Sequence, residues 1–476
     1  MEDSTYQKAI HAFVHDEPGS LTVEAKAGSG KTTTMVKAAK LLDPKQSITM
    51  LAFNVTIKDE LQQRMADAPY VKVKTFHAVG LGAIRYFDSS IIVDDKGNKC
   101  RDIYRGLPDS DPEIESQVLR LVSFAKTMPF ENPNMVAIAA IVDVVLDADK
   151  LDNAIAFAAQ VLRLSNRNTQ LIDFDDMVYL PAIGKFPVYR SDALVIDERQ
   201  DMNLAQIALI KRMMKSTSRA IAVGDRNQSI YGFRGANTEA MDEFTSAIGA
   251  TELPLSICYR CDKEIIKLAQ QIVPEIEWRP GAGDGIVDTL GESKIADVIQ
   301  YGDSILCRTN APLVKTALSL ISRGKKAYVR GRDIGRNLLT LIKKVQRKYV
   351  VNNLPDLMRA IVEYKDAEVT KLIIAEKPGP ASTLSDQTET LIALSEGART
   401  IEDLMKNIET IFADNSVGIV CSSIHKAKGT ENDRIFLLHP ELLPHPMAKT
   451  LKQRQQEMNL KYVAITRAKH HLTFIQ

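Results

Sequence analysis

The sequence predicts an α/β protein with two parallel sheets in tandem, each covered by helices on both faces. Short, continuously apolar runs alternate with segments of helical pattern. That alternation is typical of strands buried on both faces of a parallel sheet. The runs fall into two groups along 476 residues, of which 45% are hydrophobic and 25% charged. This composition is that of an ordinary globular protein with enough apolar residues for more than one core.

The first group of apolar runs precedes residue 256. Five strands are expected there: Leu21–Ala25, Ser47–Phe53, Val71–Phe76, Asp192–Glu198 and Arg219–Asp225. A helix is expected from Lys31 to Leu42, shortly after the first strand. Polar residues gather at the carboxyl ends of these strands, which is where parallel sheets bind their ligands.

The second group predicts another parallel sheet. Its expected strands are Ser304–Arg308, Lys326–Gly331, Gly418–Ser423, Arg434–His439 and His471–Ile475. Two long helical stretches, 88–170 and 338–405, interrupt the groups and are too long to be loops. We therefore expect a first sheet domain from 1–87 and 171–255, a second from 256–337 and 406–476, and one helical insertion in each.

Charge and cysteine content narrow the possible functions. The net charge is +1, so binding to a polyanion would depend on local patches. Among the five cysteines only Cys258 and Cys261 are close, without a second pair at zinc spacing, so we expect reduced thiols in a cytoplasmic protein.

The amino terminus lacks the features of a secretory signal. The longest apolar stretch, Met135–Leu146, contains Asp143 and predicts a buried helix, so no membrane partner is expected.

The stretch VEAKAGSGKTTT, Val23 to Thr34, predicts a triphosphate site. Gly28 and Gly30 allow the backbone to bend around a phosphate with its N–H groups directed inward. Lys31 would reach the β- and γ-phosphates, and the Thr32 hydroxyl would bind Mg²⁺. Ala25 stands where the general pattern has glycine.

Two acidic residues end the strand in VIDERQD. Asp197 is the predicted second anchor for Mg²⁺, and Glu198 is predicted to orient the water that attacks ATP. Gln228, which follows the next predicted strand, is expected to sense the γ-phosphate.

Two aromatic residues in GDRNQSIYGFRGA predict a platform for nucleic-acid bases. Tyr231 and Phe233 are two positions apart, beside Arg234, so an extended chain would present both rings on one face. Two core aromatics on a strand are the alternative. The neighbouring charged residues favour the platform, because charges are rarely buried unpaired.

Taken in order, these motifs resemble those of the UvrD/Rep family of superfamily 1 DNA helicases. The resemblance covers nearly the whole chain through TYQKAI, AKAGSGKT, LAFNVTIKDEL, KTFHAVG, IDFDDM, DERQD, GDRNQSIYGFRGA, LSICYR, CRTNAPL, SSIHKAKGTEND and NLKYVAITRAKHHL. It implies two RecA-like motor domains in tandem, with inserted helical subdomains.

The resemblance also implies roles in ATP binding and hydrolysis. The implied nucleotide-binding residues are Gln7, Ala27, Gly28, Ser29, Gly30, Lys31, Thr32, Thr33, Tyr259 and Glu431. Gln7 would read adenine, Tyr259 would stack on it, and Glu431 would lie near the ribose. The implied catalytic residues are Lys31, Glu198, Gln228, Arg260 and Arg467. Arg467 would be the arginine finger, and Arg260 would reach the γ-phosphate.

Single-stranded DNA is the implied partner. The implied contacts are Phe53, Asn54, Thr75, Phe76, His77, Tyr231, Phe233, Arg234 and His425, with the four Phe and Tyr side chains stacking on bases. Three basic residues would add contacts to the DNA backbone: Arg308, Lys426 and Lys428. The alternative is that they are solvated surface charges.

The implied function is an ATP- and Mg²⁺-dependent DNA helicase that moves 3′→5′ and separates strands at junctions of duplex and single-stranded DNA. Cys258 stands where the family has Asn, and Thr430 where it has Leu. The second insertion is shorter than the regulatory subdomain of better-known members, and no nuclease domain is expected after the last strand. The alternative is a DNA-stimulated ATPase subunit without independent unwinding, serving a nuclease, repair or replication partner.

Overall fold

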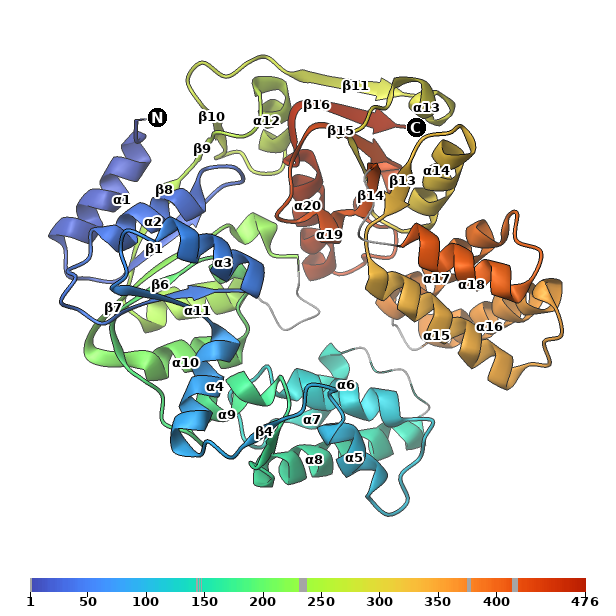
Figure 1. Ribbon diagram of the computed structural model, residues 1–476, viewed down its shortest axis with the longest axis horizontal. Helices are drawn as coiled ribbons and strands as arrows, with labels where there is room; N and C mark the ends of the chain where they lie inside the picture. The colour runs from blue at the N-terminus through green and yellow to red at the C-terminus, as the bar shows by residue number, and fades with distance from the viewer. Residues whose placement is uncertain are drawn as a thin grey trace. The chain divides into compact units, whose positions relative to one another are not determined.

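The computed structural model describes residues 2–142, 144, 146, 148–230, 238–374, 378–412 and 418–476. The chain divides into two compact units, Met1–Ile257 and Cys258–Gln476. Each unit is built on its own six-stranded sheet (Figure 1). All recorded strand pairs in both sheets are parallel, which confirms the predicted fold class.

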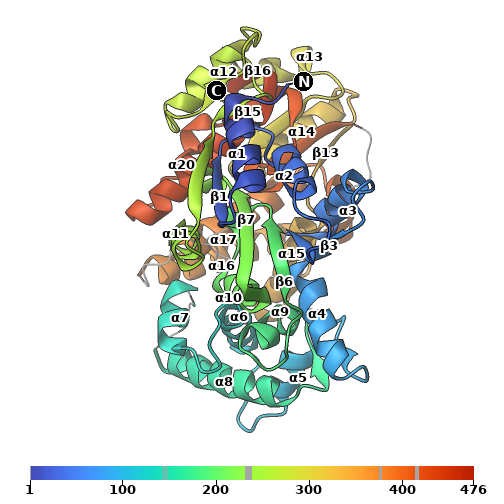
Figure 2. The same ribbon diagram turned by 90° about the vertical axis from the view of Figure 1, so that its left-hand side faces the viewer.

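The first sheet has the strand order β3-β2-β6-β7-β1-β8. Its strands are β1 (Leu21–Ala25), β2 (Ile48–Ala52), β3 (Val71–Thr75), β6 (Ser191–Ile196), β7 (Met214–Gly224) and β8 (Thr251–Leu255). Figure 2 shows β1, β7 and β6 side by side. The sequence did not predict β8, because its TELPL run is an edge strand that is mostly exposed to solvent.

Helices cover both faces of this sheet, because successive apolar side chains of its central strands point to opposite faces and both faces must be buried. Ala193 and Val195 of β6 belong to one buried core, which also contains side chains from α1, α2 and α3. Leu194 and Ile196 belong to the opposite core, with side chains from α4, α9, α10 and α11. These helices are α1 (Thr5–Asp16), α2 (Lys31–Lys40), α3 (Val55–Arg64), α4 (Phe76–Phe87), α9 (Asp176–Ala182), α10 (Leu204–Met213) and α11 (Thr238–Ala247).

The first insertion is helical, as the length of the 88–170 stretch suggested. It contains β4 (Ile92–Val93), α5 (Lys99–Arg105), α6 (Glu115–Ala125), α7 (Met135–Ile141) and α8 (Ala148–Arg167), and β4 pairs with β5 (Leu171–Ile172). The prediction of one buried helix from Met135 to Leu146 was wrong. The helix ends at Ile141, and Val136 and Ile141 are 65% and 58% exposed. Only the face with Ile138 and Ala139 packs inward, since α7 is a surface helix with one buried stripe.

Two buried lysines connect this insertion to the segment that leads into α9. Lys99 Nζ lies 2.6 Å from Asp176 Oδ2, and Lys126 Nζ lies 2.7 Å from Asp176 Oδ1 and 2.5 Å from Asp173 Oδ2. Both lysine side chains are 1% exposed. Because an unpaired buried charge is costly, these contacts hold residues 173–176 in one position relative to α5 and α6.

The second sheet has the strand order β11-β16-β15-β12-β14-β13. Its strands are β11 (Ile286–Leu290), β12 (Ser304–Cys307), β13 (Ala327–Val329), β14 (Ile419–Ser423), β15 (Asn432–Leu438) and β16 (Ala468–Ile475). Strand β11, which the sequence did not predict, is a largely exposed edge strand. The remaining elements outside the insertion are β9 (Ile257–Cys258), β10 (Glu277–Trp278), α12 (Lys263–Gln270), α13 (Ile295–Val298), α14 (Ala311–Ser322), α19 (Ile424–Ala427) and α20 (Leu451–Ile465).

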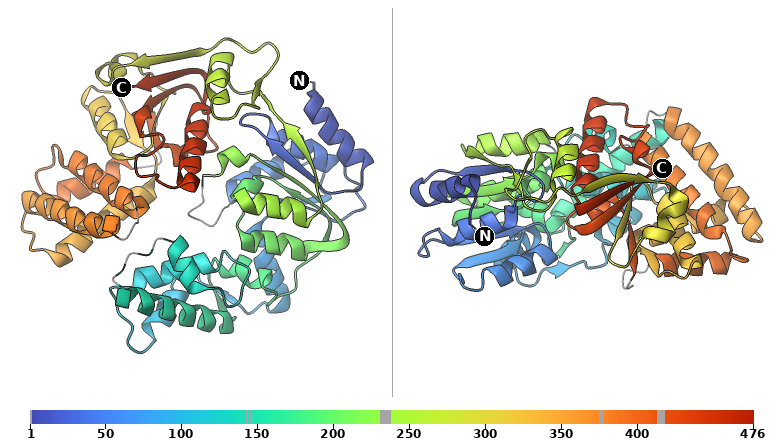
Figure 3. Two further views of the ribbon diagram at one scale, coloured as in Figure 1. Left: turned by 180° about the vertical axis from the view of Figure 1, so that it is seen from behind. Right: turned by 90° about the horizontal axis from the view of Figure 1, so that it is seen from above.

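In its described residues, the second insertion is a bundle of four helices beside this sheet (Figure 3). They are α15 (Arg332–Lys348), α16 (Leu354–Ile374), α17 (Pro378–Ser395) and α18 (Ile401–Ile411). Ile305 of β12 and Leu357 of α16 belong to one continuous core, so the bundle and the sheet are packed together.

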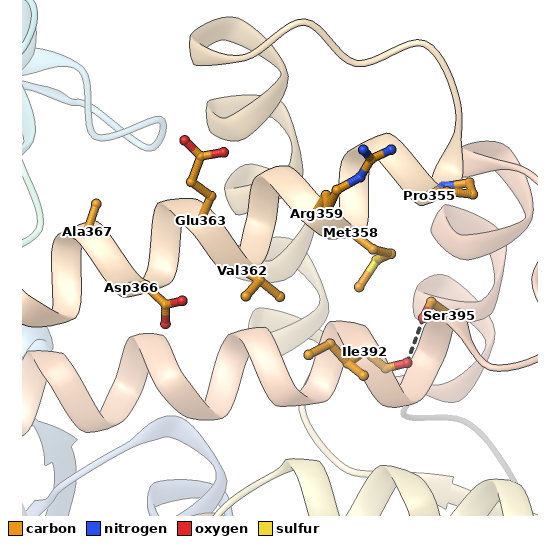
Figure 4. Close-up of a pocket in the computed structure, with 9 residues that line it drawn as sticks. All are labelled: Pro355, Met358, Arg359, Val362, Glu363, Asp366, Ala367, Ile392 and Ser395. Carbon is orange, nitrogen blue, oxygen red and sulfur yellow. Dashed lines mark hydrogen bonds between the residues drawn. The ribbon is translucent and has the colours of Figure 1, made fainter.

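An open groove of about 830 Å³ runs between α16 and α17. Val362 and Ile392 face each other across it (Figure 4). None of the residues predicted to bind nucleotide or DNA lines this groove. Among the described helices, none is both long enough and apolar enough to cross a membrane.

Candidate nucleotide and DNA sites

The phosphate loop joins β1 to α2, as predicted. Gly28 and Gly30 have φ values of 66° and 81°, in the left-handed region that favours glycine. Their conformation directs the chain into α2, whose first N–H groups form an anion-binding end. The Ser29 hydroxyl is buried in this loop and has no hydrogen-bond partner among the described residues. A phosphate oxygen would supply such a partner.

The predicted metal ligands and the catalytic carboxylate lie at this loop. The Thr32 hydroxyl donates a hydrogen bond of 3.0 Å to Asp197 Oδ2. Lys31 Nζ lies 3.6 Å from Glu198 Oε2. Burial, followed by the charge of Glu198, raises the pKa of Asp197 to about 6. A hydroxyl and a carboxylate oxygen fit Mg²⁺, which binds few protein ligands and keeps several waters. No cluster of three or more metal-ligating side chains occurs in the described part of the chain.

A chain of hydrogen bonds links Gln228 to Glu198. Gln228 Nε2 donates to Asp225 Oδ2 at 2.6 Å, and the Asp225 N–H donates to Gln200 Oε1 at 3.0 Å. Gln200 Nε2 in turn donates to Glu198 Oε2. A Cβ on Gly224 would lie 2.6 Å from Gln200 Oε1, so the chain depends on glycine there. Sequence reasoning missed Asp225 and Gln200, although both follow strand ends in the motifs that supplied Glu198 and Gln228.

The predicted adenine-reading glutamine also lies beside the loop. Gln7 Nε2 donates to the Thr34 hydroxyl at 3.1 Å, and Gln7 forms a capping box with Ser4 at the start of α1. A Cβ on Gly30 would lie 3.6 Å from Gln7 Nε2. The Thr33 hydroxyl accepts a hydrogen bond of 3.2 Å from Arg64 Nη1. Ala27 is fully buried in the loop.

Three of the predicted DNA contacts have structural roles here. Asn54 Oδ1 caps α3 by accepting from the Ile57 N–H at 2.8 Å, and the Thr75 hydroxyl caps α4 by accepting from the Ala78 N–H at 3.1 Å. Phe76 is 1% exposed and packs in the core beneath the sheet. The prediction that Phe76 stacks on a base was therefore wrong, because its ring is already buried among core side chains. Phe53 is half-buried.

His77 contacts an exposed aromatic ring that the sequence did not single out. Its ring stacks on Phe174 with centroids 3.8 Å apart and an interplanar angle of 21°. Phe174 is 60% exposed. Burial lowers the pKa of His77 to about 4, so the imidazole is neutral at neutral pH. The motif IDFDDM was recognised in the sequence, but no signal in it marks Phe174 as exposed, because Asp173 and Asp176 beside it pair with buried lysines. Tyr231, Phe233 and Arg234 lie outside the described residues.

The second unit brings both predicted catalytic arginines together. Arg260 donates to Glu431 through Nε and to the Thr466 carbonyl through Nη1 at 3.1 Å. Arg467 Nη1 donates to the Thr430 carbonyl at 3.0 Å, and its side chain is nearly fully buried. Burial, followed by the charge of Arg260, lowers the pKa of Arg467 to about 10, which still leaves it protonated at neutral pH.

Tyr259, the predicted adenine-stacking residue, is half-buried. Its carbonyl accepts a hydrogen bond of 3.0 Å from Arg279 Nη1. That bond fixes the backbone directly before Arg260.

Three other predicted DNA contacts of this unit, His425, Arg308 and Lys426, are neutral or paired with a carboxylate. Burial lowers the pKa of His425 to about 4. Arg308 forms a two-pronged pair with Glu457, at 2.9 Å from Nε and 2.8 Å from Nη2. Lys426 Nζ lies 2.7 Å from Asp333 Oδ2. Phosphate binding by either cation would therefore compete with a carboxylate.

Comparison with known proteins gives matches to both units. Residues 6–248 match the UvrD/REP helicase N-terminal domain, and residues 325–476 match the UvrD-like helicase C-terminal domain. The chain is 24% identical over 541 aligned residues to the ATP-dependent DNA helicase UvrD2 of Mycobacterium tuberculosis, covering 95% of this chain and 76% of that protein. It is 26% identical over 343 residues to the ATP-dependent DNA helicase PcrA of Staphylococcus aureus, covering 65% of this chain and 45% of that protein.

Proposed function

The chain belongs to the UvrD/Rep-like superfamily 1 DNA helicases, whose members are DNA-dependent ATPases, and on that premise we propose that it couples ATP hydrolysis to 3′→5′ movement on single-stranded DNA and to strand separation. One observation carries the ATPase part. The Thr32–Asp197 hydrogen bond of 3.0 Å and the Lys31–Glu198 pair at 3.6 Å lie together behind the phosphate loop. This set of groups can hold a metal–triphosphate and a water molecule.

Each group at the phosphate loop would have its own role in the reaction. The first N–H groups of α2 would hold the phosphates, and Lys31 would exchange Glu198 for the β- and γ-phosphates. Glu198, thus released, would orient the attacking water. Thr32 and Asp197 would hold Mg²⁺, which offsets the negative charge of the phosphates. The hydrogen-bond chain from Gln228 through Asp225 and Gln200 would keep Glu198 directed at the water.

Arg260 and Arg467 would complete the catalytic set from the second unit. An arginine finger accelerates phosphoryl transfer by roughly 10³–10⁵-fold. Arg260 would exchange Glu431 and the Thr466 carbonyl for phosphate oxygens. Since these arginines and Lys31 belong to different units, we propose that the units close on ATP and open on ADP. That cycle would move the DNA-binding segments of one unit relative to those of the other.

The stacked rings of His77 and Phe174 would form part of the DNA path. The exposed face of Phe174 can stack on a base of any identity, at about 1–3 kcal/mol per base, which agrees with binding that reads little sequence. The neutral state of His77 suits stacking better than phosphate binding. Phe174→Ala should weaken the apparent affinity for single-stranded DNA in the DNA-stimulated ATPase assay. Phe130→Ala is the matched control, because Phe130 is a similarly exposed ring, 55%, in the same unit.

A tailed-duplex assay tests the whole proposal. Duplexes with a 3′ tail, a 5′ tail or no tail are incubated with ATP and Mg²⁺, and release of the labelled strand is measured. Release from the 3′-tailed duplex alone is expected. ATP turnover stimulated by single strands, without release from any substrate, would favour the ATPase-subunit alternative, for which the short second insertion of four helices argues. Absence of DNA-stimulated turnover would refute both.

A further inference from the structure

Cys258 and Cys261 form a buried pair of thiols in the segment between β9 and α12. Both side chains are 0% exposed. The Cys261 N–H donates to Cys258 Sγ at 3.4 Å, so the two cysteines are in direct contact. This contact between cysteines three residues apart, in a bend of the chain, places the two side chains close enough for us to consider a disulfide between them.

The two cysteines flank residues to which the proposed function assigns nucleotide contacts. Tyr259 and Arg260 are the two residues between the cysteines. Cys261 Sγ donates to the Thr466 carbonyl at 3.7 Å, and Arg260 Nη1 donates to that same oxygen at 3.1 Å. A change in the Cys261 thiol therefore acts directly on the Thr466 carbonyl, which is a partner of Arg260. Thr466 directly precedes Arg467 in the sequence.

The five cysteines differ in reactivity. Contact with Cys261 lowers the pKa of Cys258 to about 7. Burial raises the pKa of Cys100 and of Cys307 to about 11, and that of Cys421 to about 12. Since the thiolate is the nucleophile, the lowered pKa favours Cys258 as the attacking thiol of the pair.

We propose that Cys258 and Cys261 are a site of reversible oxidation, at which a peroxide installs a disulfide that suppresses ATP turnover. The Cys258 thiolate attacks one peroxide oxygen, and with H₂O₂ and one proton the products are a sulfenic acid and water. The Cys261 sulfur then displaces the hydroxyl of the sulfenic acid, and its proton leaves with that hydroxyl as a second water. Two thiols lose two electrons and two protons in all, and one H₂O₂ becomes two H₂O. A dithiol reductant reverses the reaction and becomes a disulfide itself.

The disulfide changes the geometry around Arg260 in two ways. It closes a small ring that contains Tyr259 and Arg260, and it removes the S–H donor to the Thr466 carbonyl. A displacement of about 1 Å at a catalytic group costs on the order of 10²-fold in rate. The inference rests on the proposed function for this loss of turnover, whereas disulfide formation stands without it. Because both thiols are buried, peroxide reaches Cys258 through local opening of the segment, so oxidation is slower than at an exposed thiol.

The test uses the full chain, treated with H₂O₂ and then divided into portions with and without dithiothreitol. Peptide mass spectrometry after alkylation measures the Cys258–Cys261 disulfide, and ATP turnover with single-stranded DNA is measured on the same portions. The expected result is a disulfide between these two cysteines, a loss of turnover on the order of 10²-fold, and recovery with dithiothreitol. Cys258→Ala should remove both the disulfide and the loss. Cys421→Ala, which also removes a buried thiol of this unit, should behave like the unchanged chain.

Three outcomes would overturn the inference. The first is peroxide treatment without a Cys258–Cys261 disulfide, and the second is a disulfide that leaves turnover unchanged. The third is a loss of turnover that persists in Cys258→Ala. If the reduced chain shows no DNA-stimulated turnover, the proposed function fails and the regulatory part of the inference fails with it. The mass measurement still decides whether the disulfide forms.

Discussion

Replacement of Gly80 by alanine should separate two helices of the first unit. Gly80 lies in α4, where the backbone passes close to α9. A Cβ at this position would lie 1.7 Å from the Met177 carbonyl oxygen and 2.8 Å from its carbon, although real Cβ contacts essentially never fall below 3.0 Å. In Gly80→Ala the helices must therefore move apart by at least 1.3 Å, the difference between 3.0 and 1.7 Å.

The cost follows from the nature of the obstacle. Overpacking costs about 1–3 kcal/mol, and the upper end applies because backbone, unlike a flexible side chain, cannot rotate away. Alanine gains about 1 kcal/mol in helix propensity over glycine, so the net loss is about 2 kcal/mol. At about 1.4 kcal/mol per factor of ten, amides of α4 and α9 should exchange roughly 30-fold faster in Gly80→Ala.

Hydrogen–deuterium exchange of peptides from α4 and α9 is the assay of choice. The single tryptophan, Trp278, belongs to the second unit, so its fluorescence is a poor reporter of this packing. Gly82→Ala is the matched control on the same helix, since a Cβ there meets nothing within 4 Å. It should gain about 1 kcal/mol and slow exchange. Exchange in Gly80→Ala no faster than in Gly82→Ala would show that α4 and α9 do not pack this closely.

Three further substitutions and one change of conditions test the site and its support. Asp176→Asn leaves Lys99 and Lys126 without their shared carboxylate and should cost about 3–5 kcal/mol, seen as faster proteolysis of the first insertion; an unchanged proteolysis rate would contradict the pairing. Glu198→Gln should retain ATP binding, measured with a fluorescent ATP analogue, but lose turnover, and near-normal turnover would remove Glu198 from its proposed role. Chelation of Mg²⁺ should abolish turnover, and Thr32→Val should raise the Mg²⁺ concentration needed for half-maximal turnover; an unshifted Mg²⁺ dependence would argue against Thr32 as a ligand.

The strands and the phosphate loop could be predicted because their signals are local. A run such as Ile48–Ala52, apolar except for Thr49, is buried along its whole length, and Gly28 and Gly30 are needed for a turn whose shape depends on a few residues. The edge strands β8 and β11 escaped prediction for the same reason. Their side chains are largely exposed, so no apolar run marks them.

The assignment of aromatic rings to core or surface depended on segments distant in sequence. Phe76 and His77 are neighbours with similar local signals, yet Phe76 is buried in the core while His77 stacks on the exposed Phe174. Which ring is covered is decided by α9 and α10, whose side chains share the core with Phe76. No window around KTFHAVG contains that information.

The sequence by itself determined the class of the fold, the order of its motifs and the residue types proposed to bind a triphosphate, because backbone conformation and hydrophobic periodicity are properties of short segments. Only the tertiary structure decided which side chains meet. It brought Gln200 and Asp225 between Gln228 and Glu198, and it placed the Cys261 thiol and Arg260 on one carbonyl oxygen. Such contacts join residues from different elements, and hydrogen-bond partners across elements are set by packing rather than by spacing along the chain.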